Sequence, residues 1–360
     1  MTEKIRRMFP GGNTSRGFYS YYDYIIEKDA NRIFVLKGGP GTGKSSLMKK
    51  VANIMTKKGY DIEYHHCSSD NESIDGLVIP NLKVAMIDGT APHIVDPKNP
   101  GAVDEIIHLG DYWDVRGLES NKESIIYYIE KNAKFYKTAY KYLEAARLII
   151  EDIIWKHEES LIFGDLNKET DVLIQEILGH AVVSKEVGKT RHLFGSAYTP
   201  RGYIDYTEEQ IGSPEEVKIY YIEGDVGTGK STMLTKIYKN AVEKGYDVEV
   251  FHTPLIPEKI MSVNIKELNI ALTTSQIYKD NSYREINLEQ NLDKNYIERY
   301  SESINEDKIK YEELLKIALK NISRAKENHD KIEDYYIPNM NFDEYNELRD
   351  RIVSKMLRYE

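Results

Sequence analysis

The sequence predicts an α/β protein made of two tandem domains, each with a parallel sheet flanked by helices and followed by a long helical region. Three observations support this prediction. A glycine-rich motif occurs twice, 186 residues apart; each copy lies between a strand-like run and a helix-like run; and the residues around the two copies repeat.

Both glycine-rich motifs fit the pattern G-x-x-x-x-G-K-[ST] of a P-loop, or Walker A motif. They consist of Gly38, Gly39, Pro40, Gly41, Thr42, Gly43, Lys44 and Ser45, and of Gly224, Asp225, Val226, Gly227, Thr228, Gly229, Lys230 and Ser231. In this motif, backbone N–H groups cradle phosphate oxygens, the lysine reaches the β- and γ-phosphates, and the next hydroxyl binds Mg²⁺. Two P-loop NTPase domains are therefore predicted, with Lys44 and Lys230 on phosphates and Ser45 and Ser231 on the metal. Ser46 and Thr232 extend the predicted nucleotide sites.

The expected elements follow the same order in both domains. Apolar runs at 33–36 and 219–222 predict strands before the motifs, and residues 45–58 and 231–244 predict helices after them. In the first domain, residues 61–66 and 83–87 read as the second and third strands. Strands that alternate with helical segments predict a parallel sheet.

The repeat extends beyond the glycine-rich motifs. Residues 38–66 align with 224–252 without a gap, and 13 of the 29 positions are identical. We place the domain boundary near residue 187, which predicts a first P-loop domain over 1–186 and a second over 187–360.

Each domain ends in a long helical region. Residues 119–162 contain no Gly or Pro, and their apolar positions recur at helical spacing; residues 291–336 are similar, and Pro338 ends them. A hairpin of two helices is favoured over one rod of about 65 Å in each region. Such a region either packs on its own sheet or forms a lid or an arm that docks a protein partner.

The two predicted sites differ in their second metal ligand. In the first domain, four apolar residues lead to Asp88, which is the pattern of a Walker B strand whose carboxylate binds Mg²⁺. At the same offset the second domain has Thr274, so its Walker B motif is degenerate. We therefore expect an active first site and a second site that only binds nucleotide or is vestigial.

The general base has three candidates in the loop-rich segment after Asp88. His93, Asp104 and Glu105 are ionisable, and loops that leave the carboxyl ends of strands carry the chemistry of many α/β proteins. Together with Lys44 and Asp88 they form the predicted catalytic set.

Composition narrows the class of protein. The net charge of −10 argues against a broad grip on nucleic acid. The single cysteine, Cys67, excludes an internal disulfide and suits a reducing compartment. No uncharged apolar run of about 18 residues occurs, so no membrane span is expected, and a cytoplasmic location is favoured.

The chain resembles an uncharacterised bacterial family of duplicated P-loop proteins that are labelled ATPase or nucleotide-kinase-like. The resemblance covers nearly the whole length and rests on both P-loops, on His66-Cys67-Ser68-Ser69-Asp70, on Asp88-Gly89-Thr90-Ala91-Pro92-His93, and on Asp96-Pro97 through Trp113-Asp114. It implies ATP binding.

The favoured function is that of a Mg²⁺-dependent ATPase. Two alternatives stay open. One is a kinase that transfers the γ-phosphate to a nucleotide or another small acceptor bound near 89–114. The other is a nucleotide-gated interaction protein with negligible turnover. ATP is favoured over GTP because the guanine-reading motif Asn-Lys-x-Asp does not occur.

Overall fold

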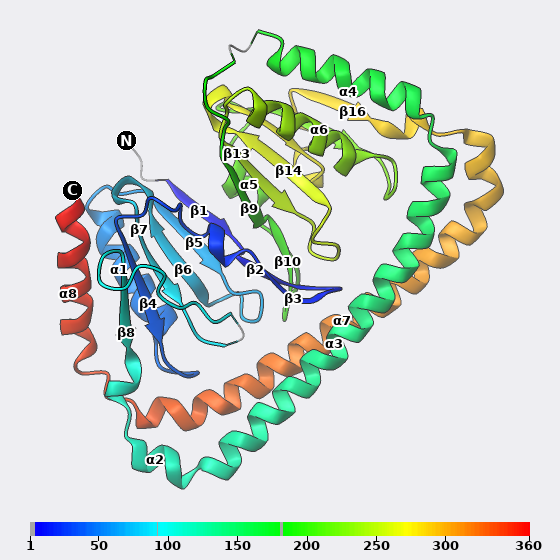
Figure 1. Cartoon of the computed structure of the whole chain (residues 1–360). Helices are drawn as coiled ribbons and strands as arrows, with labels where there is room; N and C mark the ends of the chain where they lie inside the picture. The colour runs from blue at the N-terminus through cyan, green and yellow to red at the C-terminus, as the bar shows by residue number, and fades with distance from the viewer. Residues whose placement is uncertain (1–3, 92, 181–182) are drawn as a thin grey trace.

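Two six-stranded sheets lie on the same side of a pair of very long helices (Figure 1). The structure is a computed structural model that describes residues 4–91, 93–180 and 183–360. It has a mixed α/β fold, in which each sheet is followed along the chain by long helices.

The first half of the chain forms the first sheet and its hairpin. Its elements are β1 (Ile5–Met8), β2 (Gly11–Thr14), β3 (Gly17–Ser20), β4 (Arg32–Lys37), α1 (Lys44–Lys57), β5 (Ile62–His66), β6 (Ile74–Ile79), β7 (Val84–Asp88) and β8 (Asp104–His108). Helices α2 (Val115–Ser120), α3 (Lys122–Ser160) and α4 (Phe163–Leu178) follow.

The second half repeats this order. Its elements are β9 (Thr190–Phe194), β10 (Ser196–Thr199), β11 (Gly202–Asp205), α5 (Thr207–Ile211), β12 (Lys218–Glu223), α6 (Lys230–Glu243), β13 (Val248–His252), β14 (Ile260–Ile265), β15 (Ile270–Thr273) and β16 (Arg284–Asn287). Helices α7 (Lys294–Tyr336) and α8 (Tyr345–Met356) follow. The domain boundary near residue 187, which separates the two copies of the repeat, stays a prediction.

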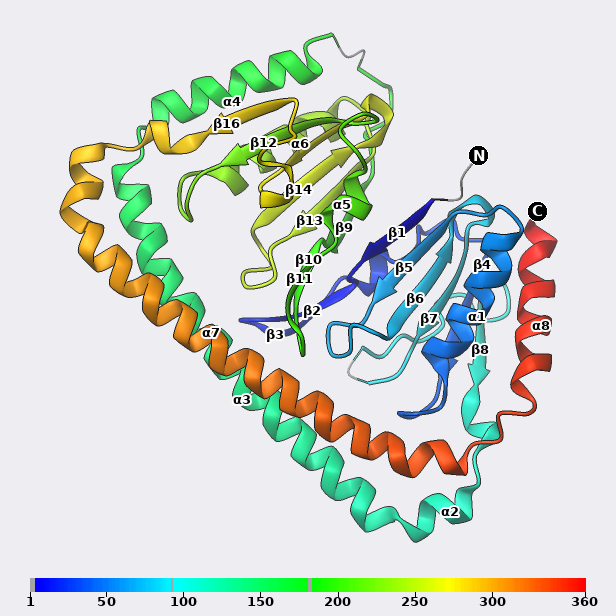
Figure 2. The ribbon, with the colours of Figure 1, turned by 180° about the vertical axis from the view of Figure 1, so that it is seen from behind.

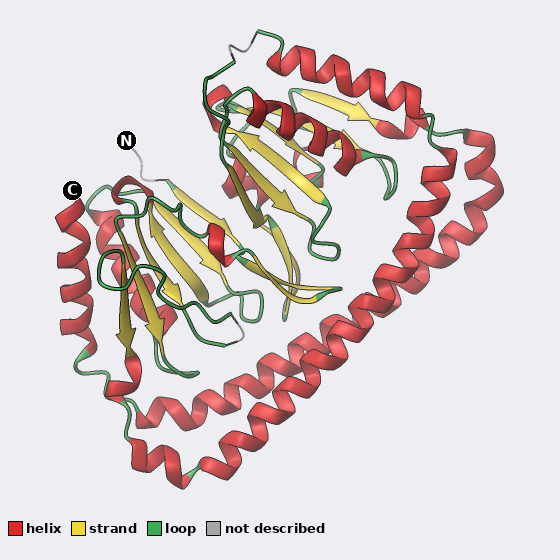
Figure 3. Cartoon of the chain, in the orientation of Figure 1, coloured by secondary structure: helices red, strands yellow, loops and turns green. Residues whose placement is uncertain are grey.

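Both sheets are mixed, so the predicted parallel pairing holds for part of each sheet (Figure 3). The first has the order β1-β5-β6-β7-β4-β8, and the second has the matching order β9-β13-β14-β15-β12-β16. Strands β6 and β14 run antiparallel to both neighbours. The connections into and out of these strands are too short for a parallel crossover, which needs a dozen or more residues. The predicted strands at 33–36, 61–66 and 83–87 coincide with β4, β5 and β7.

One continuous helix makes up most of each long helical region, so the predicted hairpins are wrong. Helix α3 has 39 residues and α7 has 43, which correspond to about 58 and 64 Å. The two helices run antiparallel beside each other, because the end of α3 meets the start of α7 at the Leu161–Leu292 bridge. Each rod gains its support from the other, a contact that neither sequence region shows alone.

A buried seam joins α3 and α7. Ala139, Leu143, Ala146, Ile150 and Ile153 on α3 recur every three or four residues, as in a coiled coil. Buried Ala318 and Ala325 are among the residues of α7 at this seam, where small side chains permit close approach.

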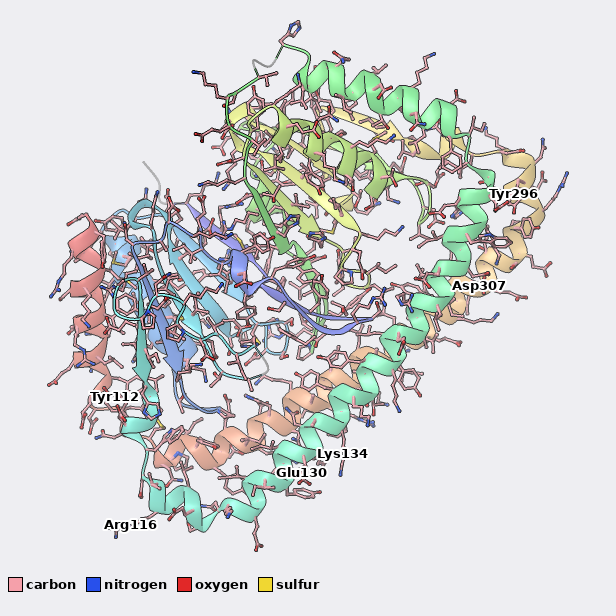
Figure 4. The ribbon with its side chains drawn as sticks, viewed as in Figure 1. Tyr112, Arg116, Glu130, Lys134, Tyr296 and Asp307 are labelled. Atoms are coloured by element: carbon pink, nitrogen blue, oxygen red, sulfur yellow. The ribbon has the colours of Figure 1, made fainter. Side chains whose placement is uncertain are left out.

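One buried ion pair also crosses this helix pair. Lys156 of α3 lies 2.7 Å from Asp307 of α7, which is labelled where the helix pair runs beside the second half (Figure 4).

The terminal helices pack on the opposite halves (Figure 2). Helix α8, at the end of the chain, lies against α1 and shares the core of the first sheet. Helix α4, which follows the first half, lies against α6 and shares the core of the second sheet. Each half therefore completes its core with a helix from the other half. The sequence indicated packing of each helical region on its own sheet as one alternative, and it did not predict this exchange.

Four charged side chains, three of them buried and Arg191 partly exposed, hold the two sheets together. Arg6 on β1 contacts Glu63 on β5 at 2.7 Å and Glu249 on β13 at 2.6 Å. Arg191 on β9 contacts the same carboxylates at 2.7 and 3.3 Å, so the four side chains form a closed ring. Burial alone would raise the pKa of Glu63, but the two guanidinium groups hold it well below its ordinary value.

The edge strands beside this ring also meet directly. The Phe9 N–H donates to the Phe194 carbonyl at 3.1 Å, and the Phe194 N–H donates to the Phe9 carbonyl at 3.0 Å. We call the four charged residues, Arg6, Glu63, Arg191 and Glu249, the interface ring.

Replacement of one carboxylate of the interface ring should strongly destabilise the protein. Glu63→Gln leaves buried guanidinium charge without its partner, which costs about 3–5 kcal/mol. The exposed pair Arg16–Glu258 offers a control, and Glu258→Gln should cost less than about 1 kcal/mol. Urea unfolding of the full chain measures both values, and equal losses would contradict the role assigned to the ring.

The crossed position of α8 gives a second prediction. Leu348, which is 1 % exposed, packs into the first core, so Leu348→Ala should lower stability by about 2–5 kcal/mol. The exposed neighbour Glu347 is the control, and Glu347→Ala should change stability by less than about 0.5 kcal/mol. A small effect of Leu348→Ala on thermal unfolding would argue against this packing.

Candidate functional site

The first glycine loop, residues 38–45, connects the carboxyl end of β4 to the start of α1. Gly43 precedes the helix with φ 78°, a left-handed conformation that suits glycine. The Lys44 ammonium donates to the carbonyl oxygens of Gly38 and Gly39, both at 2.8 Å. It also lies 3.6 Å from a carboxylate oxygen of Asp88. The structure thus brings the predicted Lys44 and Asp88 together.

Two further ionisable side chains join Asp88 beside the glycine loop. Asp75, at the start of β6, and His93, after β7, each offer a ligand atom, and these atoms lie within 4.8 Å of one another and of Asp88. The His93 Nε2 atom is 3.8 Å from Asp75, and its ring stacks on Tyr22 with centroids 4.5 Å apart. The Nδ1 atom of His93 is buried and has no hydrogen-bond partner among the described residues.

Asp75 is the residue that the sequence interpretation missed. The Tyr22 hydroxyl donates to it at 2.6 Å. Burial, reinforced by the like charge of Asp88 and opposed by His93, raises the pKa of Asp75. The signal for strand β6 was the run of β-branched and apolar residues from Ile74 to Ile79, which Asp75 and Gly76 interrupt.

Ser45 lies close to this cluster, and its hydroxyl accepts a hydrogen bond from the Ile74 N–H at 3.1 Å. The hydroxyl of Ser45 and the carboxylates of Asp75 and Asp88 are hard oxygen donors, the ligand type that Mg²⁺ prefers. The chemistry of this donor set therefore fits the predicted metal. Ser46 follows within the first turn of α1.

Asp104 and Glu105 lie elsewhere. Both are at the amino end of β8, where Asp104 pairs with Ile33, whereas the glycine loop follows Lys37 at the other end of β4. The four-residue step along β4 from Ile33 to Lys37 separates Asp104 from the glycine loop by roughly 13 Å. Asp104 accepts from the Asn99 N–H at 2.5 Å, and Glu105 pairs with Lys355. They line a surface cavity of about 510 Å³ and do not meet Lys44.

The second glycine loop, residues 224–231, has the same backbone course but different surroundings. Lys230 donates to the Gly224 and Asp225 carbonyls, and the Ser231 hydroxyl accepts from the Ile260 N–H at 2.9 Å. Burial lowers the pKa of Lys230 to about 8. Thr232 follows within α6.

No carboxylate stands where the first site has two. Met261 and Thr274 occupy the positions of Asp75 and Asp88 in the repeat, and the Thr274 N–H donates to the Met261 carbonyl at 3.0 Å. The loop itself carries Asp225, whose carboxylate accepts from the Val226 N–H and pairs with Lys308 of α7 at 2.5 Å. Compared with the first loop, the second loop therefore lacks the two carboxylates beside it but carries the carboxylate of Asp225 within it.

A long helix from the opposite half covers each glycine loop. At the first loop, a carboxylate oxygen of Glu333 on α7 accepts from the Gly41 N–H at 3.2 Å. At the second loop, the backbone of α3 approaches so closely that a Cβ on Gly227 would lie 2.7 Å from the Ile154 carbonyl oxygen. His157 of α3 also bonds the Val226 carbonyl at 2.5 Å.

Comparison with known proteins gives one partial match. A family model described as Nephrocystin 3, N-terminal, matches residues 19–77, which run from β3 into β6 and include the first glycine loop. No curated protein and no solved structure matches the chain significantly. Within the described part of the chain, every helix is too short or too polar to cross a bilayer.

The equivalent serines allow a matched test of the two loops. Ser45→Ala and Ser231→Ala each remove the acceptor of a strand N–H, which should cost about 1–3 kcal/mol in both cases. Thermal unfolding without added ligand measures the two losses. A loss for one variant alone would show that the two loops do not share this architecture.

Proposed function

We propose that the first half of the chain binds ATP with Mg²⁺ and hydrolyses it. One observation carries the proposal: the glycine loop of residues 38–45 places Lys44 3.6 Å from Asp88, beside Ser45, Asp75 and His93. The loop pattern, the lysine and the acidic strand end are the parts from which P-loop NTPases build their site.

Each residue has an assigned task in this proposal. The N–H groups of residues 39–45 hold phosphate oxygens, and Lys44 neutralises charge on the β- and γ-phosphates. Ser45 and Asp88 would hold Mg²⁺, which supplies charge neutralisation at the phosphates.

Water is the attacking group in the proposed reaction. Its oxygen forms a bond to the γ-phosphorus while the bond to the β–γ bridging oxygen breaks and ADP leaves. The water proton passes to the unpartnered Nδ1 atom of His93, and Asp75 orients the ring from its other side, 3.8 Å from Nε2. Asp104 and Glu105 have no part in this step because of their place on β8.

The second glycine loop has a different task in this proposal. Its cradle lacks an acidic partner for magnesium, contains Asp225, and packs tightly against α3. We propose that it holds nucleotide weakly or not at all and serves mainly as a socket for α3.

The two loop lysines give the first test of this function. Lys44→Ala should abolish the heat of ATP·Mg²⁺ binding and the release of phosphate, because the γ-phosphate loses its main cation. Lys230→Ala should leave phosphate release within about twofold of the unaltered chain. Calorimetry and a phosphate-release assay measure these outcomes; an intact rate in Lys44→Ala would refute the proposed site.

His93 gives the second test. His93→Gln should lower kcat by roughly 10²–10⁴, with little change in nucleotide affinity, because only proton transfer is lost. The exposed His108, which pairs with Asp111, provides the control, and His108→Gln should keep the rate of the unaltered chain. Equal rates for the two variants would exclude His93 as the base.

A further inference from the structure

We propose that Glu333, on the long helix of the second half, is an internal competitor of the nucleotide at the first glycine loop. The inference rests on the proposed function, since it concerns the same loop. In this proposal α7 is a gate that the phosphates must displace, so the second half of the chain controls the first site.

The contact lies on a phosphate-binding group. A carboxylate oxygen of Glu333 is 3.2 Å from the backbone nitrogen of Gly41, at the centre of the loop whose N–H groups cradle phosphate in this motif. The carboxylate and a phosphate are both anions and both need this N–H group. They cannot bind it together, because like charges a few ångströms apart repel each other.

The second loop shows that helix packing alone does not require an acid here. Gly41 and Gly227 occupy the same place in the repeat, and each lies against the backbone of the covering helix. The helix residue over Gly41 is Glu333, and the one over Gly227 is Ile154. An apolar residue thus suffices to cover the second loop, so the carboxylate at the first loop is a specific feature of that site.

The end of α7 is held at the first loop by several further contacts. A Cβ on Gly39 would lie 2.9 Å from the ring of Tyr336 at the end of α7, and beyond it Tyr345, the first residue of α8, donates its hydroxyl to the Thr42 carbonyl. Nearer the centre of α7, Lys326 lies 3.3 Å from Asp70, which follows β5. Displacement of Glu333 therefore loosens a set of contacts between the helix end and the loop.

The continuity of α7 extends this effect to the second half. The helix runs unbroken for 43 residues and, about a third of the way along it, Lys308 pairs with Asp225 in the second glycine loop. Both glycine loops thus contact the same helix. A phosphate that displaces Glu333 at one end acts on an element that is anchored at the other loop.

Charge removal at Glu333 tests the competition. Glu333→Gln keeps the shape of the side chain and removes its charge, and Glu333→Ala removes the contact. Both should bind ATP·Mg²⁺ on the order of tenfold more tightly than the unaltered chain. Asp334→Asn is the matched control, because it makes the same charge change at an exposed neighbour, and its affinity should stay within about twofold. Calorimetry on full-length chains gives the dissociation constants, and thermal unfolding verifies that the variants are folded.

The outcomes separate this inference from the proposed function. Tighter binding by the Glu333 variants than by Asp334→Asn supports the gate. Equal or weaker binding by the Glu333 variants overturns the gate and leaves ATP binding standing. No binding by any of the chains, Glu333 variants included, overturns both.

A measurement on the unaltered chain provides independent support. Addition of ATP·Mg²⁺ should increase amide hydrogen exchange over residues 326–340, because the helix end leaves the loop. A chain that binds ATP while exchange over this segment stays unchanged contradicts the gate.

Discussion

The arrangement of the molecule depends on the buried interface ring. Because Glu63 and Glu249 each meet both Arg6 and Arg191, the two sheets share their buried charges, and neither can move away without exposing an uncompensated ion. The Phe9–Phe194 hydrogen bonds fix the edge strands beside the ring. With the sheets held in this way, both glycine loops face the long helix pair, and the ends of α3 and α7 reach the loop of the opposite half (Figure 1).

The sequence predicted the elements that depend on interactions between residues close together in the chain. The glycine loops, the strands before them and the helices after them were found from residues that are neighbours in the chain, such as Gly43 and Lys44. The antiparallel strand β6 was missed because its register depends on the short turns around it and its sequence contains Gly76. The single long helices were missed because their stability comes from each other, through contacts such as the one between Asn328 and Tyr128, which are 200 positions apart.

The candidate site shows the same limit. Asp88 was predicted from its strand, but its neighbours Asp75 and His93 come together only through the path of β6 and the loop after β7. Asp104 and Glu105 looked equivalent to His93 in the sequence, and only the pairing of β8 with β4 separates them from the loop. The duplication thus keeps one scaffold twice, while Met261 and Thr274 stand in the second copy where the first has Asp75 and Asp88.

The exchange of terminal helices has a consequence for biosynthesis. The strands of the first sheet leave the ribosome early, but α8, which packs against α1 in their core, is made more than 200 residues after β8. At typical rates of translation, the interval between β8 and α8 is on the order of ten seconds or more. During that time the nascent first half exposes the apolar surface that α8 later covers, and such transiently exposed surface favours aggregation of an unfinished chain.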